Sequence, residues 1–254
     1  MTNAPIHIRP TAELAPRALL PGDPGRALML AQLLLDEPRM FNHHRGLWGY
    51  TGTAADGVPL TIQSTGMGGP SIAIVVAELI DLGLRSAIRV GTAAALSDGL
   101  ELGDTVIARE AIVADGTSRT LGADGRALAD PELTDSLCAA APEASAGAVV
   151  STDLFYVGDA PDGDAARDAD WRRAGALAVE MEAATLFTLA ARRGVAAGCV
   201  LAISDLLRDG RRVRIADPEL QSAAERIGRV AVAALVSASG SGSVTEAATP
   251  TANA

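Results

Sequence analysis

The chain contains no lysine: all 21 of its basic residues are arginine, against 31 acidic residues. This excludes sites that need an ammonium group, such as the lysine of a P-loop or of a Schiff base. The formal net charge of −10 also disfavours binding to the phosphates of nucleic acids. The cation that remains available is the guanidinium group, whose planar fork can hold a phosphate through two hydrogen bonds at once.

Aromatic residues, cysteine and histidine are also scarce. Aromatics make up 3% of a chain that is 48% hydrophobic, so we expect a core of Ala, Val, Leu and Ile. Cys138 and Cys199 stand far apart among small residues, which is typical of buried fillers in a reducing compartment. The histidines, His7, His43 and His44, show no metal-ligand spacing, so no metal site is expected. With no membrane-length apolar run and no leader-like start, the chain reads as a soluble cytoplasmic protein.

The length and the order of apolar segments predict one α/β domain. A chain of 254 residues is ample for one large domain and short for two. Segments 48–53 and 58–63 flank Asp56-Gly57, a strong hairpin signal. Residues 237–254 are Ser, Gly, Ala and Thr for the most part, which predicts a mobile tail. We therefore expect a central mixed sheet flanked by helices over residues 1–236.

The expected elements alternate along the chain. Helical spacing predicts helices over 27–35, 71–82, 133–140, 165–174, 183–193 and 218–236. Short apolar runs predict further strands over 18–20, 87–90, 105–108, 111–114, 148–151, 176–180 and 199–204.

Two carboxylates stand where an expected strand gives way to an expected helix. Glu180 and Glu182 are separated by Met181. If the pair is still extended, the carboxylates project to one side and Met181 to the other. Carboxylates can accept hydrogen bonds from a sugar diol, and a thioether can pack beneath its ring. The alternative is an ordinary acidic first turn of a helix.

Four expected turns combine glycine with arginine or a hydroxyl group. They lie at Gly22 with Arg26, at Arg45-Gly46, at 66–69, and at Arg89 with Gly91-Thr92. Backbone N–H groups and guanidinium groups together suit a free phosphate ion, and the spacings fit neither a P-loop nor a dinucleotide motif. Arg26 and Arg45 taken singly could be solvated surface residues. Arg89 lies inside an apolar strand, where a buried guanidinium needs an anionic partner.

Seven ordered motifs make the chain resemble the nucleoside phosphorylase family that contains hexameric purine nucleoside phosphorylases, uridine phosphorylases and methylthioadenosine phosphorylases. The motifs are Pro-Gly-Asp-Pro-x-Arg (21–26), Arg-Gly (45–46), Thr-Gly-Met-Gly-Gly-Pro-Ser (65–71), Arg-Val-Gly-Thr (89–92), Ser-Thr-Asp-Leu-Phe-Tyr (151–156), Val-Glu-Met-Glu-Ala-Ala (179–184) and Ser-Asp (204–205). The resemblance covers about residues 5–236. It implies a distorted, partly barrel-like mixed sheet and an oligomer with active sites shared between subunits, commonly a trimer of dimers.

The resemblance also implies roles for individual residues. Phosphate, the co-substrate, would be held by Gly22, Arg26, Arg89, Thr92 and by Arg45 of the partner subunit. The nucleoside would contact Met67, Phe155, Met181, Glu182 and the partner subunit's His7, with Glu180 nearby. Asp205 would act on the purine, assisted by one of Arg208, Arg211, Arg212 and Arg214, of which we prefer Arg208. No cofactor is implied.

Each of these residues also has an ordinary structural interpretation. Met67 and Met181 could fill gaps in the core, and Phe155 could be a core aromatic. His7 could belong to a frayed terminus. Asp205 could cap a following helix.

The implied reaction is reversible phosphorolysis of the N-glycosidic bond of purine nucleosides. Phosphate attacks the anomeric carbon as the base departs, so catalysis is mainly orientation and electrostatics. A protonated Asp205 could deliver a proton to N7 of the leaving purine. Uridine phosphorylases lack this acid and typically carry a Gln-x-Arg element, whereas 157–175 contains no Gln, so a purine is favoured. Ala94, where the family usually has Gly, departs from the pattern, and loop 206–216 leaves a 5′-methylthio substituent open. The alternatives are a uridine or methylthioadenosine phosphorylase and, in a different class, a non-catalytic nucleoside-binding relative.

Overall fold

A computed structural model describes residues 5–156, 163–208 and 211–241. The strands are β1 (Arg17–Leu20), β2 (Asp36–Asn42), β3 (Gly49–Thr53), β4 (Pro59–Gln63), β5 (Ser86–Ala95), β6 (Thr105–Ala114), β7 (Arg126–Leu128), β8 (Ser145–Thr152), β9 (Ala176–Glu180), β10 (Ala196–Arg208) and β11 (Arg211–Arg214). The helices are α1 (Pro24–Leu34), α2 (Gly69–Asp81), α3 (Gly116–Thr120), α4 (Pro131–Ala140), α5 (Gly163–Arg173), α6 (Ala183–Arg193) and α7 (Asp217–Ser241), with a 3-10 turn at His44–Gly46.

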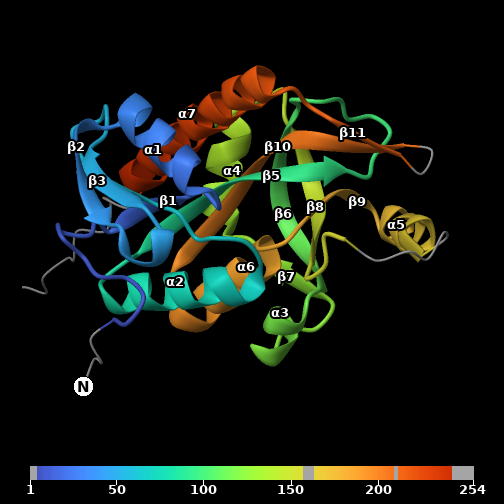
Figure 1. The fold of residues 1–254 in the computed structure, drawn as a ribbon, viewed down its shortest axis with the longest axis horizontal. Helices are drawn as coiled ribbons and strands as arrows, with labels where there is room; N and C mark the ends of the chain where they lie inside the picture. Colours follow the sequence, from blue (N-terminus) through green and yellow to red (C-terminus); the bar gives the residue numbers. More distant parts are fainter. Residues whose placement is uncertain (1–4, 157–162, 209–210, 242–254) are drawn as a thin grey trace, which may run out of the picture.

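Five of the strands close into a barrel (Figure 1). β5 pairs in parallel with β10, which pairs antiparallel with β6; β6 and β8 are parallel, as are β8 and β9, and β9 returns antiparallel to β5. From this ring the sheet continues through β1, β4, β3 and β2, while β11 adds to β10 and β7 to β6. The single domain with a mixed, partly barrel-like sheet is therefore confirmed.

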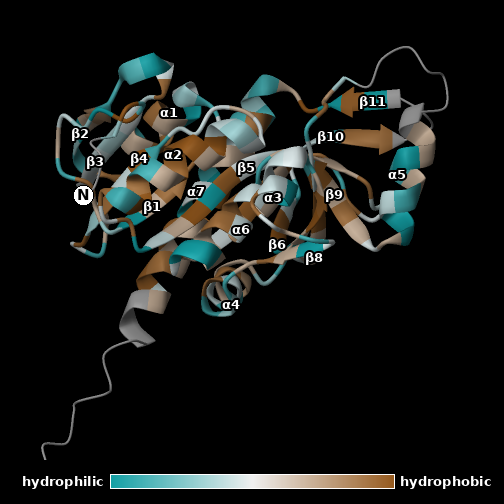
Figure 2. Cartoon of the chain, turned by 90° about the horizontal axis from the view of Figure 1, so that it is seen from below, coloured by the Kyte–Doolittle hydropathy of each residue, from teal (hydrophilic) through white to brown (hydrophobic). Residues whose placement is uncertain are grey.

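Helices cover both faces of the sheet. One apolar cluster joins the strands to α2 and α6, including the fully buried Ile72 and Leu79, and a second joins them to α1, α4 and α7. Figure 2 shows mostly apolar residues along β10 and mostly hydrophilic ones on α5. Small and aliphatic side chains dominate both clusters, as the scarcity of aromatics predicts. No described helix is long and apolar enough to cross a membrane.

The expected elements are present, with differences that have physical causes. The hairpin is confirmed as β3 and β4, and 105–114 is one strand instead of two pieces because a bulge at Arg109 absorbs the break in its pattern. Sequence analysis missed β2, whose first five residues are exposed, and the short elements α3, β7 and β11. Helix α7 runs to Ser241, five residues past its expected end at 236, because Ser and Gly each cost the helix only about 1 kcal/mol or less. The rest of the expected tail lies outside the described residues.

A buried ion pair fastens the hairpin to β1. Arg17, only 4% exposed, donates from Nη2 to Asp56 Oδ1 at 2.6 Å and from Nε to the Pro59 carbonyl at 3.0 Å. The hydrogen bond from Arg17 lowers the pKa of Asp56 although partial burial opposes it. We expect Asp56→Asn to lower the free energy of unfolding by about 2 kcal/mol at pH 7, since it leaves a buried guanidinium without its counter-charge.

Chemical denaturation at several pH values measures this effect. A carboxylate with a depressed folded-state pKa stabilises the protein above its unfolded pKa of about 3.9, and the stabilisation is lost as pH falls through the folded-state pKa. The difference in the free energy of unfolding between the wild type and Asp56→Asn should therefore become smaller below about pH 4. The exposed Asp36→Asn serves as a control with a change below about 0.5 kcal/mol. A pH-independent difference would contradict the ionic interpretation.

Candidate active site

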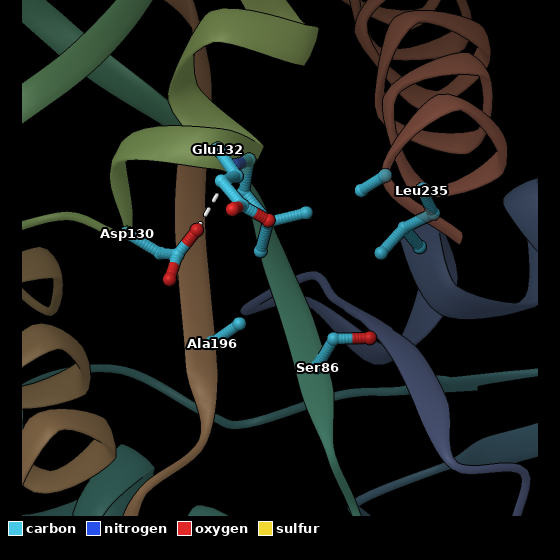
Figure 3. A pocket seen from close by; sticks show the side chains of 7 residues that line it. Ser86, Asp130, Glu132, Ala196 and Leu235 are labelled. Atoms are coloured by element: carbon cyan, nitrogen blue, oxygen red, sulfur yellow. Dashed lines mark hydrogen bonds between the residues drawn. The ribbon is translucent and has the colours of Figure 1, made fainter. Parts of the chain in front are cut away.

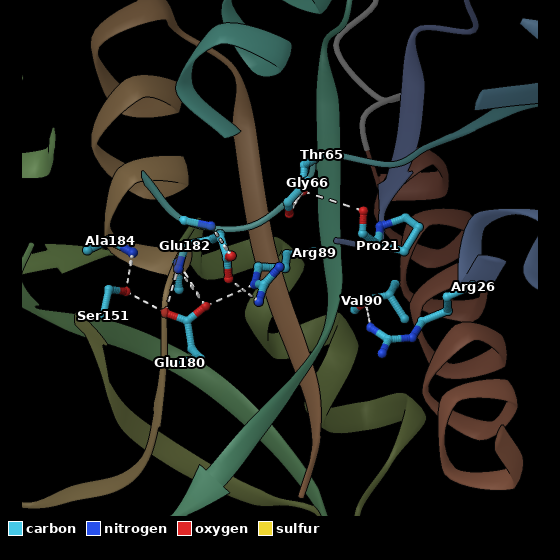
Figure 4. A network of polar contacts seen from close by, with 12 residues as sticks. Pro21, Arg26, Thr65, Gly66, Arg89, Val90, Ser151, Glu180, Glu182 and Ala184 are labelled. Atoms are coloured by element: carbon cyan, nitrogen blue, oxygen red, sulfur yellow. Dashed lines mark hydrogen bonds and ion pairs between the residues drawn. The ribbon is translucent and has the colours of Figure 1, made fainter. Parts of the chain in front are cut away.

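The glycine turns meet at one edge of the sheet. Strands β1, β4, β5 and β10 are mutually parallel, so their carboxyl ends lie together, which is where open α/β sheets bind ligands. The turn after β4 is tied to the turn after β1, because Thr65 N donates to the Pro21 carbonyl at 2.9 Å and Gly66 N to the Gly22 carbonyl at 3.0 Å (Figure 4). The first backbone turn of the expected phosphate site is therefore joined to the turn that carries Met67.

Arg26 is positioned by the start of α1. Asp23 caps this helix by accepting a hydrogen bond from the Arg26 backbone N–H, and Pro24 occupies its first turn. The Arg26 guanidinium then reaches across to the Val90 carbonyl in β5 at 3.4 Å. Burial and the nearby Arg89 both lower the pKa of Arg26. An anion bound between the two guanidinium groups would relieve both effects.

Arg89 lies at the centre of the site. Its Nε donates to Glu180 Oε2 at 2.9 Å, and its Nη2 pairs with Glu182 Oε2 at 2.5 Å. Nη1 is buried and has no hydrogen-bond partner among the described residues. A Cβ atom at Gly22 would lie 3.9 Å from Nη1, so the unpartnered group faces the first glycine turn. A Cβ atom at Gly91 would lie 2.8 Å from the guanidinium carbon, so only glycine fits beneath it.

The charges around Arg89 compensate one another. Burial alone would lower the pKa of Arg89, but Glu182 and Glu180 outweigh it and raise the pKa. Burial raises the pKa of the adjacent Cys199 thiol, which pairs with Arg89 across β5 and β10 and stays neutral. The site therefore presents a permanent cation with one free donor direction. The two carboxylates are the anionic partners that the sequence predicts for a buried arginine.

Glu180 is fully occupied within the protein. It accepts hydrogen bonds from the backbone N–H groups of Glu182 and Ala183, which begin α6, and from the Ser151 hydroxyl at 2.5 Å (Figure 4). Its side chain has no solvent exposure. Glu180 therefore orients Arg89 and the start of α6. Sequence analysis did not assign Ser151, although it begins one of the motifs.

Glu182 connects Arg89 to the glycine turn before α2. Its Oε1 accepts the Gly68 backbone N–H at 2.5 Å, where Gly68 has φ +84°, and its other oxygen pairs with Arg89. The acidic pair does stand at the start of α6, as the alternative interpretation expected, but only Glu180 accepts N–H groups of that helix. Glu182 occupies the N-cap position without accepting a side-chain hydrogen bond from it. Met67 is 85% exposed beside this turn, which rules out a role as a core filler, and Met181 is half-buried.

Asp205 lies inside β10, so its interpretation as a helix cap is wrong. A bulge makes Ser204 an extra residue opposite β5, because Ile203 pairs with Ala93 and Asp205 with Ala94. Neighbours in a regular strand point to opposite faces, yet here Ser204 Oγ donates to Asp205 Oδ2 at 2.7 Å. Asp205 is 3% exposed.

Two arginines of β11 pair with this acid. Arg214 approaches Asp205 to 3.4 Å and Arg212 to 3.7 Å. The Arg212 guanidinium also lies 4.2 Å from the ring centroid of Phe155, which is 43% exposed and not a core residue. Arg208, the arginine preferred from sequence, ends β10, and its side chain lies outside the described part of the chain. Among the described arginine side chains, those of Arg212 and Arg214 pair with the acid.

The remaining predicted residues are not brought to Arg89 by the described contacts of one chain. His7 Nδ1 lies 2.8 Å from Glu78 Oε1. Glu78 is about 14 Å further along α2 than Gly69, where the site begins. Arg45 is exposed in the 3-10 turn with φ +59°, and Thr92 is half-buried within β5. His7 is nevertheless held in place by its contacts with Glu78, which sets aside the frayed-terminus interpretation.

A cavity of about 180 Å³ lies elsewhere (Figure 3). It is lined by Ser86 and Ala196, which begin β5 and β10, so it faces the amino ends of these strands. Its Asp130 caps α4 through a hydrogen bond from Leu133 N. The cavity is also smaller than the roughly 300 Å³ typical of ligand pockets. It is therefore not the active-site candidate.

Comparisons with known proteins agree with this geometry. A family model described as the phosphorylase superfamily matches residues 16–237. A uridine phosphorylase of Thermococcus kodakarensis is 41% identical over 204 residues, covering 75% of this chain and 73% of that protein. A DeoD-type purine nucleoside phosphorylase of Geobacillus kaustophilus is 39% identical over 213 residues, covering 81% and 87%. The crystal structure of a uridine phosphorylase from Vibrio fischeri superposes with a TM-score of 0.77 at 26% identity, covering 88% and 92%.

These relatives fall on both sides of the division between purine and uridine enzymes, and the solved structure among them shares the fold described above. The matched range extends over nearly all of the described residues and spans the positions of the glycine turns, Arg89, Glu182 and Asp205. The chain is therefore an enzyme that belongs to the nucleoside phosphorylase family.

Proposed function

We propose that this enzyme catalyses reversible phosphorolysis of purine ribo- or deoxyribonucleosides, giving the free base and the pentose 1-phosphate. The observation that carries the proposal is the buried, unpartnered Nη1 of Arg89, which faces the Gly22 turn. A buried donor without a partner costs about 1–3 kcal/mol, and a phosphate oxygen would satisfy it. Inorganic phosphate is then a co-substrate, and no cofactor takes part.

Phosphate binding explains why the guanidinium groups of Arg26 and Arg89 lie near each other. Arg26 and Arg89 act as forks, and the Gly22 turn and the Thr92 hydroxyl supply further donors. The buried carboxylates of Glu180 and Glu182 fix Arg89, so its position does not depend on the anion. The bound phosphate is thereby held in line with the anomeric carbon, which is the main contribution of orientation to the rate.

The sugar lies beside Glu182, which connects Arg89 to the glycine turn before α2. Its hydroxyl groups donate to the Glu182 carboxylate, whose oxygens retain lone pairs beyond those used by Gly68 and Arg89. Met67 and Met181 pack against the ring. Positive charge that develops on the sugar is stabilised by the adjacent phosphate dianion.

Asp205 is the general acid that protonates the purine at N7. The Ser204 hydroxyl orients it, and Arg214 and Arg212 lie beside it. Phe155, which is 43% exposed and has Arg212 over its ring, stacks on the base. Arg208 stays a candidate for assisting Asp205.

The active site is shared between subunits of a homo-oligomer, with a trimer of dimers as the proposed assembly. Arg45 of the partner subunit adds to the phosphate site, and the partner subunit's His7 contacts the 5′ end of the nucleoside. This division is consistent with the described contacts, since His7 pairs with Glu78 of its own chain and Arg45 is exposed. The free thiols of Cys138 and Cys199 suit a cytoplasmic location.

A side-by-side assay tests the substrate assignment. Inosine, adenosine, methylthioadenosine and uridine are incubated with and without phosphate, and release of the base is measured. We expect phosphate-dependent cleavage of a purine nucleoside with kcat/KM at least about tenfold above that of uridine. Faster cleavage of uridine would establish the second candidate, which the Thermococcus relative favours. Cleavage without phosphate would indicate a hydrolase, and binding without cleavage a non-catalytic protein.

A further inference from the structure

One fully buried side-chain amide joins two segments that are distant from each other in sequence. Asn42, at the end of β2, accepts hydrogen bonds at Oδ1 from Arg9 N at 2.9 Å and from His44 N at 3.3 Å. Its Nδ2 donates to the carbonyls of Leu47 at 2.5 Å and of His44 at 3.4 Å. The first contact holds the N-terminal segment 6–11, and the other three hold the turn that carries Arg45.

Each segment is also held from a second side. Glu78 accepts the backbone N–H groups of residues 6–8 and contacts the His7 ring. Gln63 Nε2 donates to the Leu47 carbonyl at 2.9 Å. Both segments are therefore ordered by buried or half-buried polar side chains, and Asn42 contacts both of them.

The requirement at position 42 is chemically specific. The side chain must accept two hydrogen bonds with one atom and donate two with the other, which an asparagine amide does in this small space. Aspartate can accept but cannot donate to the two carbonyls, and alanine removes all four contacts, including the shared acceptor of the Arg9 and His44 N–H groups. The left-handed conformation of Arg45, at φ +59°, is sustained only if its turn is fixed from outside.

We propose that Asn42 is a positioning residue for the active site of the partner subunit. It holds the turn of Arg45 and the segment of His7 as one rigid unit, so that the phosphate contact and the nucleoside contact enter the neighbouring site in register. This inference rests on the proposed function, because it requires the subunit-shared site described above.

Kinetics with both substrates provide the first test. We expect Asn42→Ala and Asn42→Asp to raise KM for phosphate and KM for the nucleoside, each by about tenfold, because both contacts lose their alignment. Glu78→Gln is the matched control, since among the described residues the Glu78 side chain hydrogen-bonds only to the N-terminal segment. It should raise KM for the nucleoside and leave KM for phosphate within about twofold. Unchanged KM values in Asn42→Ala would overturn the proposal.

Subunit complementation separates positioning from folding. Asn42→Ala and Asp205→Asn chains carrying different tags are co-expressed, and mixed oligomers are isolated by tandem purification. In an isologous pair, one site combines the intact Asp205 of the first chain with the intact Arg45 turn of the second, so about half of the wild-type activity per pair should return. Each variant alone should stay impaired.

A parallel mixture of Arg45→Ala and Asp205→Asn chains distinguishes the possible failures. If this mixture regains activity and the Asn42→Ala mixture does not, Asn42 acts in its own subunit or in folding, and the inference is wrong while the shared site stands. If neither mixture regains activity, the shared site itself is wrong, and the inference falls with it. If the wild-type homo-oligomer itself showed no phosphorolysis, the proposed function would be refuted instead.

Discussion

Replacement of Arg89 by alanine should lower kcat/KM for phosphate-dependent cleavage by at least about 10³-fold. The variant removes the buried donor that faces the Gly22 turn and the guanidinium that Glu180 and Glu182 hold in place. Because phosphate supplies both the nucleophile and the stabilising negative charge, the loss should fall on KM for phosphate and on kcat together. Steady-state kinetics over a range of phosphate concentrations measure both constants.

The same variant leaves two buried carboxylates without their cation, so the stability of the protein must be followed as well. Breaking such a pair costs about 3–5 kcal/mol, and lost activity could then reflect unfolding. Arg17→Ala is a matched control, because Arg17 is equally buried, lies in the strand next to β5 and pairs with Asp56 away from the site. It should lower the melting temperature and leave KM for phosphate unchanged.

Phosphate protection gives a second readout that does not depend on turnover. At a phosphate concentration of about 100 times its Kd, binding should stabilise the wild type by about 2.7 kcal/mol and raise its melting temperature. Arg17→Ala should retain this shift, and Arg89→Ala should lose it. Near-normal activity or a retained shift in folded Arg89→Ala would remove the central argument for the site.

Asp205→Asn should lower kcat for inosine and adenosine by about 10²–10⁴-fold, the usual contribution of a general acid. Asparagine keeps the size of the side chain and can still accept from Ser204, but it has no carboxylic proton to transfer. The comparison substrate is a nucleoside already methylated at N7, whose base is cationic and leaves without protonation. Its kcat should fall by less than about tenfold in the same variant.

An equal loss with both kinds of substrate would mean that Asp205 positions the base and does not protonate it. Ser204→Ala is the control for orientation, since it removes the hydroxyl that donates to Asp205 at 2.7 Å and keeps the acid. It should lower kcat for inosine by about tenfold or less. A larger loss in Ser204→Ala than in Asp205→Asn would contradict the assigned roles.

Sequence alone predicted the parts of the fold that local patterns encode. The Asp56-Gly57 turn fixed the hairpin, and the helix over 183–193 has the same bounds in the structure. Edge strand β2 was missed because its exposed residues do not alternate, and the single strand β6 was divided because periodicity cannot anticipate a bulge. Closure of the barrel depends on pairing between strands distant in sequence, which the family resemblance implied and local patterns do not contain.

The candidate site divides in the same way. The buried position of Arg89 inside an apolar strand required an anionic partner, and the structure supplies Glu180 and Glu182. The fate of the two glutamates differs, because one caps α6 and the other contacts the turn before α2. That distinction depends on three-dimensional contacts with Gly68 and Ser151. A polar residue that positions a catalytic group, such as Ser151, cannot be told from an ordinary surface residue in a single sequence.

The bulge in β10 determines what would have to be moved if this acid were transplanted to another scaffold. Two consecutive residues of a flat strand stand on opposite sides of it, so a grafted Ser-Asp dipeptide would place its hydroxyl and its carboxylate on different faces. Ser204 and Asp205 can hydrogen-bond here because two residues of β10 lie opposite one residue of β5, Ala94. A graft must therefore include the bulge, that is, the extra residue of one parallel strand opposite its neighbour. Without the bulge, the serine hydroxyl of the grafted dipeptide would not reach the carboxylate.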